Sequence, residues 1–128
     1  MATTTTDSGT EFQHITLERH DYLAVLTLQR PDRLNALNRE MGLELHVALD
    51  QLAGEFPETR VVIITGAGRG FCSGADVGDM PKRMAAGGDR AAGTPDEGPS
   101  ITMRLAPHLR EIPQPIIAAV NVVAAGAG

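Results

Sequence analysis

The sequence is poor in cysteine and aromatic residues, and it contains no tryptophan. Its one cysteine, Cys72, excludes an internal disulfide, which fits the reducing environment of the cytoplasm. With three phenylalanines and one tyrosine, the hydrophobic core has to be built from alanine, valine, leucine and isoleucine. We therefore expect a cytoplasmic protein with an aliphatic core.

Long hydrophobic runs are also absent. The longest apolar stretch, residues 115–128, contains Asn121 and is shorter than the roughly 18 residues that a membrane-spanning helix needs. Residues 1–10 have neither the basic start nor the apolar centre of a signal peptide. We therefore expect no membrane partner.

Positive charge is in the minority. Eleven basic and sixteen acidic residues give a net charge of −5, which argues against nucleic acid as the main partner. The 128 residues are enough for one domain and too few for two. We interpret residues 1–10 as a flexible polar leader and residues 11–128 as one domain, with a mobile insertion at about 82–100.

The first half of the chain has the pattern of a hairpin followed by a helix. Apolar and polar residues alternate over 14–19, and a second strand is expected over 22–28, so the two form a hairpin. Asn38 is the expected N-cap of a helix that runs to about Glu55, with its apolar positions on one face.

Later segments predict two more strands and another helix. The run 61–64 is entirely β-branched and apolar, which is typical of a strand buried on both faces. Residues 116–120 predict another buried strand, and residues 101–112 a helix that Pro107 kinks or interrupts. Because strands alternate with helices, the fold class is α/β.

A segment of small residues follows each of these two buried strands. One covers residues 66–76 and the other residues 122–128. In α/β proteins, ligands bind at the carboxyl ends of strands, where small residues allow close approach and free N–H groups hold negative charge. Tight turns without a ligand are the alternative explanation.

Several motifs can be tested on these loops. Phe71 occupies the third glycine position of a dinucleotide-binding pattern, and the only lysine, Lys82, is not in a P-loop. Residues 70–74 match a Gly-x-nucleophile-x-Gly pattern with Cys72 at its centre, although a loop separates it from its strand. A cysteine hydrolase is thus a weaker alternative to a small buried thiol.

The histidines do not have the spacing of metal ligands. We interpret all of them as surface or packing residues and expect no metal site; they are His14, His20, His46 and His108.

Four longer motifs stand in a fixed order along the chain. They are RPDRLNAL at 30–37, VVIITGAG at 61–68, FCSGADV at 71–77 and PQPIIAAVN at 113–121. In these motifs the chain resembles the crotonase (enoyl-CoA hydratase/isomerase) superfamily over nearly its whole length. The resemblance implies an α/β spiral of ββα units, an acyl-CoA substrate, and a homotrimer or hexamer.

The resemblance also implies an oxyanion hole, in which two backbone N–H groups hold the thioester oxygen while an enolate forms. By motif position, the two donors are Ala75 and Ala127. A helix N-terminus beside such a donor adds a favourable dipole. Coenzyme A is part of the substrate, so no separate cofactor is implied.

Further substrate contacts follow from the same motifs. Arg33, Leu34 and Ala36 are expected beside the adenine and phosphates of coenzyme A, with Arg33 supplying charge. Asp76 is interpreted as an N-cap or loop-bracing carboxylate and not as an acid or base. The remaining expected contacts come from the third motif: Ser73, Gly74, Ala75, Asp76 and Val77.

The reaction itself stays open. By motif position, the two glutamates that hydratases of this superfamily use fall beyond Gly128, so we expect a truncated, N-terminal portion of the domain. Residues 126–128 (GAG) resemble the branch that isomerises double bonds or epoxides. The hypothesis is an acyl-CoA lyase or isomerase of the kind used in fatty acid metabolism. The alternative is an inactive remnant that only binds coenzyme A or packs with other subunits.

Overall fold

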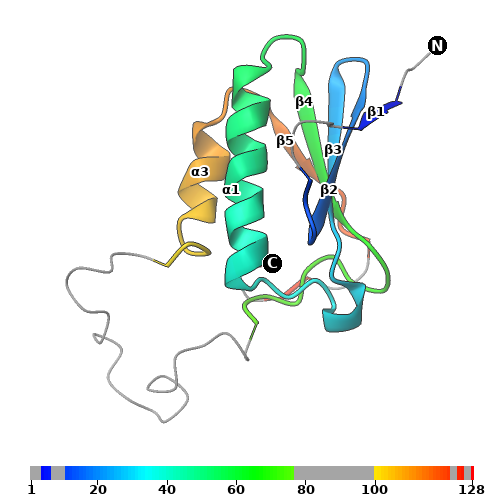
Figure 1. The fold of residues 1–128 in the computed structure, drawn as a ribbon, viewed down its shortest axis with the longest axis vertical. Coiled ribbons are helices and arrows are strands. Elements are labelled where there is room, and N and C mark those ends of the chain that lie inside the picture. Colours follow the sequence, from blue (N-terminus) through cyan, green and yellow to red (C-terminus); the bar gives the residue numbers. More distant parts are fainter. Residues whose placement is uncertain (1–3, 7–10, 77–99, 122–123, 126–127) are drawn as a thin grey trace.

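The computed structural model of the protein describes residues 4–6, 11–76, 100–121, 124–125 and 128. Most of the expected leader and nearly all of the expected insertion at about 82–100 lie outside the described residues. In Figure 1 the described part forms two layers, with a twisted sheet on one side and helices on the other.

The order of elements confirms the predicted α/β class. The sheet has the order β1-β2-β3-β4-β5 among the described residues; β1, β2 and β3 are antiparallel, whereas β3, β4 and β5 are parallel. No described helix is both long and apolar enough to cross a bilayer. The elements are β1 (Thr4–Thr6), β2 (Ile15–His20), β3 (Leu23–Leu28), the 3₁₀ helix η1 (Pro31–Arg33), α1 (Arg39–Gly54), β4 (Val61–Gly66), α3 (Leu105–Glu111) and β5 (Ile116–Ala118).

The predicted hairpin is confirmed. β2 and β3 pair from Ile15 with Leu28 to His20 with Leu23. The connection contains Asp21 at φ 55°, a left-handed conformation that aspartate tolerates better than most residues. The hairpin thus sets the register that puts the alternating apolar side chains on one face.

The predicted helix is confirmed together with its cap. The Asn38 side chain accepts a hydrogen bond from the Met41 amide at 2.9 Å, so it satisfies one of the free N–H groups of the first turn. All of the apolar positions predicted to share one face are buried: Met41, Leu45, Ala48, Leu49 and Leu52.

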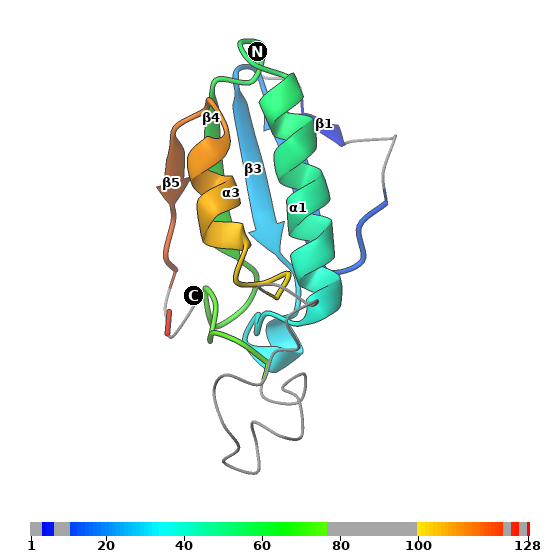
Figure 2. The ribbon, with the colours of Figure 1, turned by 90° about the vertical axis from the view of Figure 1, so that its left-hand side faces the viewer.

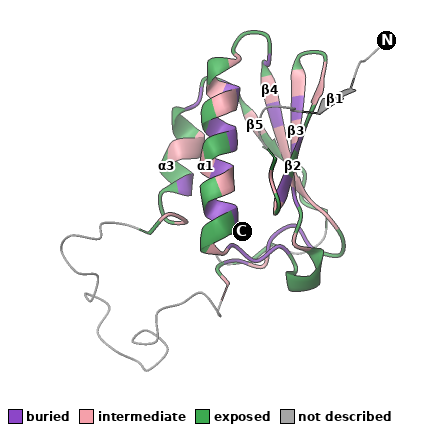
Figure 3. Cartoon of the chain, in the orientation of Figure 1, coloured by how far each residue is buried: buried purple, intermediate pink, exposed green. Residues whose placement is uncertain are grey.

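The helices α1 and α3 lie side by side over one face of the sheet, as Figure 2 shows. Because side chains alternate along a strand, only one side of each strand faces this layer. On β3, for example, Ala24, Leu26 and Leu28 are buried, and the residues between them are half-buried. The core therefore lies between the sheet and the helices (Figure 3).

Two burial predictions were wrong for the same reason. On β4 only Val62 is fully buried, so residues 61–64 are not buried on both faces. β5 spans Ile116–Ala118 at the sheet edge, and Ile117 is 54% and Val120 52% exposed. Among the described residues no element covers the second face of the sheet, and burial of a β-branched run requires one.

The prediction that Pro107 kinks a helix over 101–112 was also wrong. Residues 101–104 form turns, and α3 begins at Leu105. Pro107 therefore lies in the first turn, where its missing N–H has no helical partner to lose. The proline fixes where the helix starts and does not interrupt it.

The Asn38 cap provides a test of the fold. We expect Asn38→Ala to lower the free energy of unfolding by about 1 kcal/mol, because an amide of the first turn loses its acceptor. Asn38→Asp keeps an oxygen acceptor at the same place and should stay within a few tenths of a kcal/mol of the parent. Urea denaturation measures both, and an equal loss in the two variants would contradict the cap.

Candidate functional site

The two small-residue segments meet at one edge of the sheet. β3, β4 and β5 are parallel, so their carboxyl ends share this edge. Cys72 forms a bridge with Ala124, and the Ala125 amide donates to the Cys72 carbonyl oxygen at 3.0 Å. The loop after β4 and the segment after β5 are therefore neighbours.

The loop 30–37 is the third part of this site. The Ser73 amide donates to the Leu34 carbonyl oxygen at 3.0 Å. The Leu37 amide donates to the Gly74 carbonyl oxygen at 2.8 Å, and the Asp76 amide to the Leu37 carbonyl oxygen at 2.8 Å. The structure thus brings the first and third motifs together, with the predicted residues 33–36 beside the predicted residues 73–76.

These bonds orient the backbone of Ala75. Along an extended strand, successive amides point to opposite sides. Since Leu37 bonds to the residues before and after Ala75, the N–H of Ala75 itself points away from Leu37. Ala75 is exposed, and its amide donates to no backbone acceptor among the described residues. This amide is thus available to a ligand.

The side chain of Asn35 connects the loops beneath the site. It is 0% exposed, and its Oδ1 accepts a hydrogen bond from the Arg30 amide at 2.7 Å. Its Nδ2 donates to the carbonyl oxygens of Ala67 at 2.9 Å and Gly70 at 2.8 Å. Asn35 has φ 56°, a conformation that asparagine adopts more readily than most residues.

An ion pair braces the outer side of the same loops. Arg30 donates to the Asp76 carboxylate at 3.0 Å, and also to the Ala36 carbonyl oxygen. The two side chains are 13% and 20% exposed, so water screens this pair less than a surface pair. Asp76 therefore has the bracing contact that its interpretation required.

Arg30 and Asn35 were missed as site residues by the sequence analysis. Both belong to the first motif, but the Asp76 carboxylate that Arg30 contacts and the carbonyl groups that Asn35 contacts are distant in the chain, so no local pattern reveals them. The available signal was the asparagine inside a turn, a position at which its side chain commonly bonds to backbone groups.

Close backbone contacts explain two of the glycines. A Cβ on Gly66 would collide with the carbonyl oxygen of Phe71 and lie 2.6 Å from that of Gly70. A Cβ on Gly128 would collide with the carbonyl oxygen of Cys72 and lie 2.9 Å from its carbonyl carbon. Side chains at these positions would push the two loops apart, so tight packing alone requires glycine here.

An apolar cavity of about 430 Å³ adjoins the site. Its walls come from α1, α3, β4 and β5, and its loop end is formed by Phe71, Cys72 and Gly128. Among the described residues that line it, none is charged and only Thr102 has a hydroxyl group. Such a cavity suits an apolar group attached to a polar one held at the loops.

Cys72 is a buried thiol at the wall of this cavity. It is 2% exposed, and burial raises its pKa, although a backbone hydrogen bond from Gly74 acts in the opposite direction. His108, the only histidine after it in the sequence, bonds to His46 and Asp50 instead. These surroundings favour the interpretation of Cys72 as a small buried thiol over its interpretation as the nucleophile of a hydrolase.

Some expected site residues cannot be placed. Val77 and Ala127 lie outside the described residues. Within the described part of the chain, no group of three or more histidine, cysteine, aspartate or glutamate residues could hold a metal ion.

Comparison with known proteins assigns this arrangement to a family. A family model described as Enoyl-CoA hydratase/isomerase matches residues 18–128. The 1,2-epoxyphenylacetyl-CoA isomerase of Escherichia coli K12 is 42% identical over 106 residues, which are 80% of this chain and 38% of that protein. The crotonyl-CoA hydratase of Syntrophomonas wolfei is 33% identical over 118 residues, which are 91% of this chain and 42% of that protein. A crystal structure of an enoyl-CoA hydratase from Bacillus anthracis has a TM-score of 0.73 at 30% identity, and the match covers 91% of this chain and 43% of that one.

The chain therefore belongs to the enoyl-CoA hydratase/isomerase family, which confirms the resemblance found in the four motifs and the crotonase-like fold. It spans between 38% and 43% of the length of the first curated relatives that it matches.

Asn35 is the sharpest test of the loop packing. We expect Asn35→Ala to lower the free energy of unfolding by about 3 kcal/mol, because three hydrogen bonds are lost and alanine disfavours a positive φ. Asn121→Ala is the matched control, since the exposed Asn121 donates to the Gly68 carbonyl oxygen at 3.1 Å from the solvent side. That change should cost less than about 1 kcal/mol. Equal losses in urea denaturation would contradict the role of Asn35.

Cys72 should react slowly in the native chain. A raised pKa leaves less thiolate at a given pH than in an ordinary cysteine, and burial limits access. At pH 8 we expect iodoacetamide to modify Cys72 in the native chain at least about tenfold more slowly than in the chain unfolded in urea. Equal rates, followed by mass spectrometry, would favour the hydrolase alternative.

Proposed function

We propose that this chain binds an acyl-CoA thioester and polarises its carbonyl group, with the Ala75 and Ala127 amides as the two donors of an oxyanion hole. The observation that carries the proposal is the direction of the Ala75 N–H. The bonds of Leu37 to Gly74 and Asp76 turn that amide away from the loop 30–37, at an exposed position. The segment 124–128 supplies the second donor in this proposal.

The chemistry follows from where negative charge develops. Removing a proton next to a thioester carbonyl, or adding a nucleophile to the conjugated double bond, places charge on the carbonyl oxygen. Two fixed N–H groups stabilise that charge without any rearrangement of solvent. In enzymes, loss of one such donor reduces the rate by about 10² to 10³.

The cavity and the first motif support the same substrate. Cys72 and Gly128 of the two loops line the apolar cavity of about 430 Å³, so an acyl chain in the cavity would lie next to a thioester held at the loops. Arg33 and Leu34 are exposed, so they are accessible to the phosphates and adenine of coenzyme A in this proposal. We include in this contact set Ala36 and the predicted residues of the third motif, Ser73, Gly74, Asp76 and Val77.

The class of reaction is proposed at the level of the family, acyl-CoA hydration or isomerisation. The names of the relatives include an epoxide-type isomerase and a crotonyl-CoA hydratase, and the chain spans about two-fifths of each. None of the 128 residues is assigned here as the general acid or base, so we expect no hydration by these residues alone. A homotrimer or hexamer in the cytoplasm, with no separate cofactor, completes the proposal.

A labelled thioester tests the oxyanion donor directly. With crotonyl-CoA carrying ¹³C at the carbonyl, we expect binding to move the carbonyl resonance downfield, because hydrogen bonds polarise the C=O group. Ala75→Pro removes the N–H and should abolish most of this shift, whereas Ala75→Ser keeps the amide and the shift. The bonds of Leu37 use Gly74 and Asp76, so the proline leaves them in place.

Two outcomes would contradict the proposal. An equal shift in Ala75→Pro and Ala75→Ser would exclude the Ala75 amide as the donor. Tight binding of free coenzyme A with no carbonyl shift would instead favour the alternative, a chain that only binds coenzyme A. Measurable hydration of crotonyl-CoA by the 128 residues would show that an acid and a base are present among them.

A further inference from the structure

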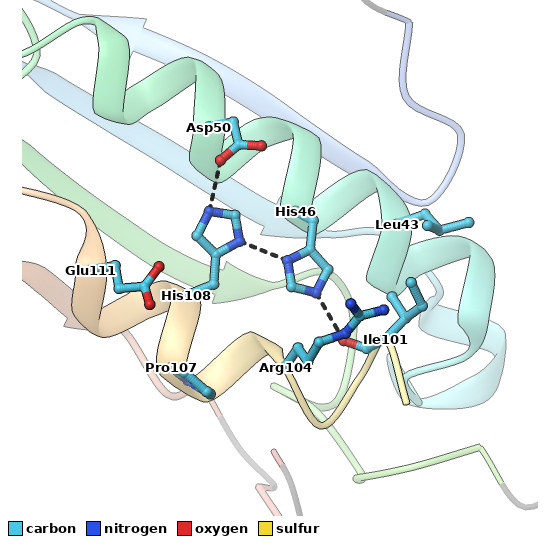
Figure 4. Close-up of a pocket in the computed structure, with 8 residues that line it drawn as sticks. All are labelled: Leu43, His46, Asp50, Ile101, Arg104, Pro107, His108 and Glu111. Carbon is cyan, nitrogen blue, oxygen red and sulfur yellow. Dashed lines mark hydrogen bonds and ion pairs between the residues drawn. The ribbon is translucent and has the colours of Figure 1, made fainter. Parts of the chain in front are cut away.

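Two histidines that have no role in the proposed function meet where α3 packs on α1. The Nδ1 atoms of His46 on α1 and His108 on α3 are 2.6 Å apart. Figure 4 shows the two rings meeting nitrogen to nitrogen in a surface pocket of about 450 Å³. The spacing of the histidines predicted surface or packing residues, and the 62 positions between His46 and His108 gave no sign of this contact.

The other nitrogen of each ring also has a partner. His46 Nε2 lies 2.8 Å from the carbonyl oxygen of Ile101, and His108 Nε2 lies 2.9 Å from Oδ1 of Asp50. A carbonyl oxygen only accepts hydrogen bonds, so His46 Nε2 carries a hydrogen. The carboxylate oxygen of Asp50 accepts as well, so His108 Nε2 carries a hydrogen too.

The partners of the two Nε2 atoms determine how many protons the two facing Nδ1 atoms hold. If both rings were neutral, each Nδ1 would direct a lone pair at the other across 2.6 Å, which is repulsive. One additional proton between these atoms turns the repulsion into a charge-assisted N–H···N hydrogen bond. We propose that His46 and His108 share one proton, that the pair carries a single positive charge balanced by Asp50, and that this proton holds α3 against α1.

The surrounding charges are compatible with such a pair. Arg104 and Glu111 line the same pocket from the two ends of α3 and contribute one charge of each sign. Asp50 comes from α1, and the sheet contributes no lining residue. The other lining residues are apolar: Leu43, Ile101 and Pro107. All four ring nitrogens are engaged, so neither ring offers a lone pair to a metal ion or a substrate.

The shared proton makes the contact between α1 and α3 depend on pH in both directions. Loss of the proton leaves two facing lone pairs, and a second proton leaves two facing N–H groups. In both cases the central hydrogen bond is lost, so the contact is strongest with one proton. Because Leu105 and Leu109 of α3 also line the apolar cavity, loosening α3 would loosen one wall of that cavity.

Nuclear magnetic resonance of the ¹⁵N-histidine-labelled chain tests the shared proton directly. We expect a scalar coupling between His46 Nδ1 and His108 Nδ1, transmitted through the N–H···N hydrogen bond, at a pH where the pair holds one proton. His14 and His20 should show no such coupling and serve as internal controls. Nδ1 resonances typical of two free lone pairs, with no coupling at any pH between about 5 and 8, would overturn the proposal.

Hydrogen exchange tests the mechanical consequence with a matched pair of variants. His46→Gln keeps a polar side chain but cannot share the proton, and we expect the protection of the α3 amides to fall about tenfold. In the parent, protection corrected for intrinsic exchange should pass through a maximum with pH, and in His46→Gln this maximum should vanish. His20→Gln, on β2 outside the pocket, should match the parent. The same pH profile in His46→Gln and the parent would overturn the proposal, whether or not coenzyme A thioesters bind.

Discussion

The buried hydrogen bonds of Asn35 are the constraint on which the candidate site depends. A single side chain bonds to the backbone of the loop before α1 and to the backbone of the loop after β4. That junction sets where Leu37 lies beside residues 74–76, and this pairing in turn decides which way the Ala75 amide points. Because Asn35 is fully buried, water cannot replace its bonds if the side chain is removed.

The two-layer architecture determines what lies next to that junction. Helices α1 and α3 cover one face of the sheet, and the space between them and the strands contains both the aliphatic core and the apolar cavity. Cys72 and Gly128 line this cavity, and the backbones of these two residues also lie in close contact where the loop after β4 meets the segment after β5. A thioester group at the loops and an apolar chain in the cavity are therefore compatible with one ligand.

The sequence predicted the features that depend on local pattern. The Asn38 cap, the buried stripe of α1 and the alternating hairpin are all read from residues a few positions apart, and each is confirmed. The four motifs, each read from consecutive residues, identified the family.

Features that depend on residues far apart in the chain could not be predicted from the sequence. The burial of β4 and β5 depends on what covers the second face of the sheet, which composition does not reveal. The ion pair of Arg30 with Asp76 and the pairing of His46 with His108 join residues far apart in the chain. In the sequence Asn35 is one residue of the first motif, and its hydrogen bonds in the structure show that it connects two loops.

The central claim is that the Ala75 amide holds the oxygen of an acyl-CoA thioester. A crystal structure of the chain with a non-hydrolysable acyl-CoA analogue tests it most directly. The account predicts the carbonyl oxygen of the analogue at roughly 2.7–3.2 Å from the Ala75 nitrogen, with the acyl chain in the cavity beside Cys72. An analogue bound with its carbonyl oxygen away from this amide, or an Ala75 N–H bonded within the protein instead, would contradict the account.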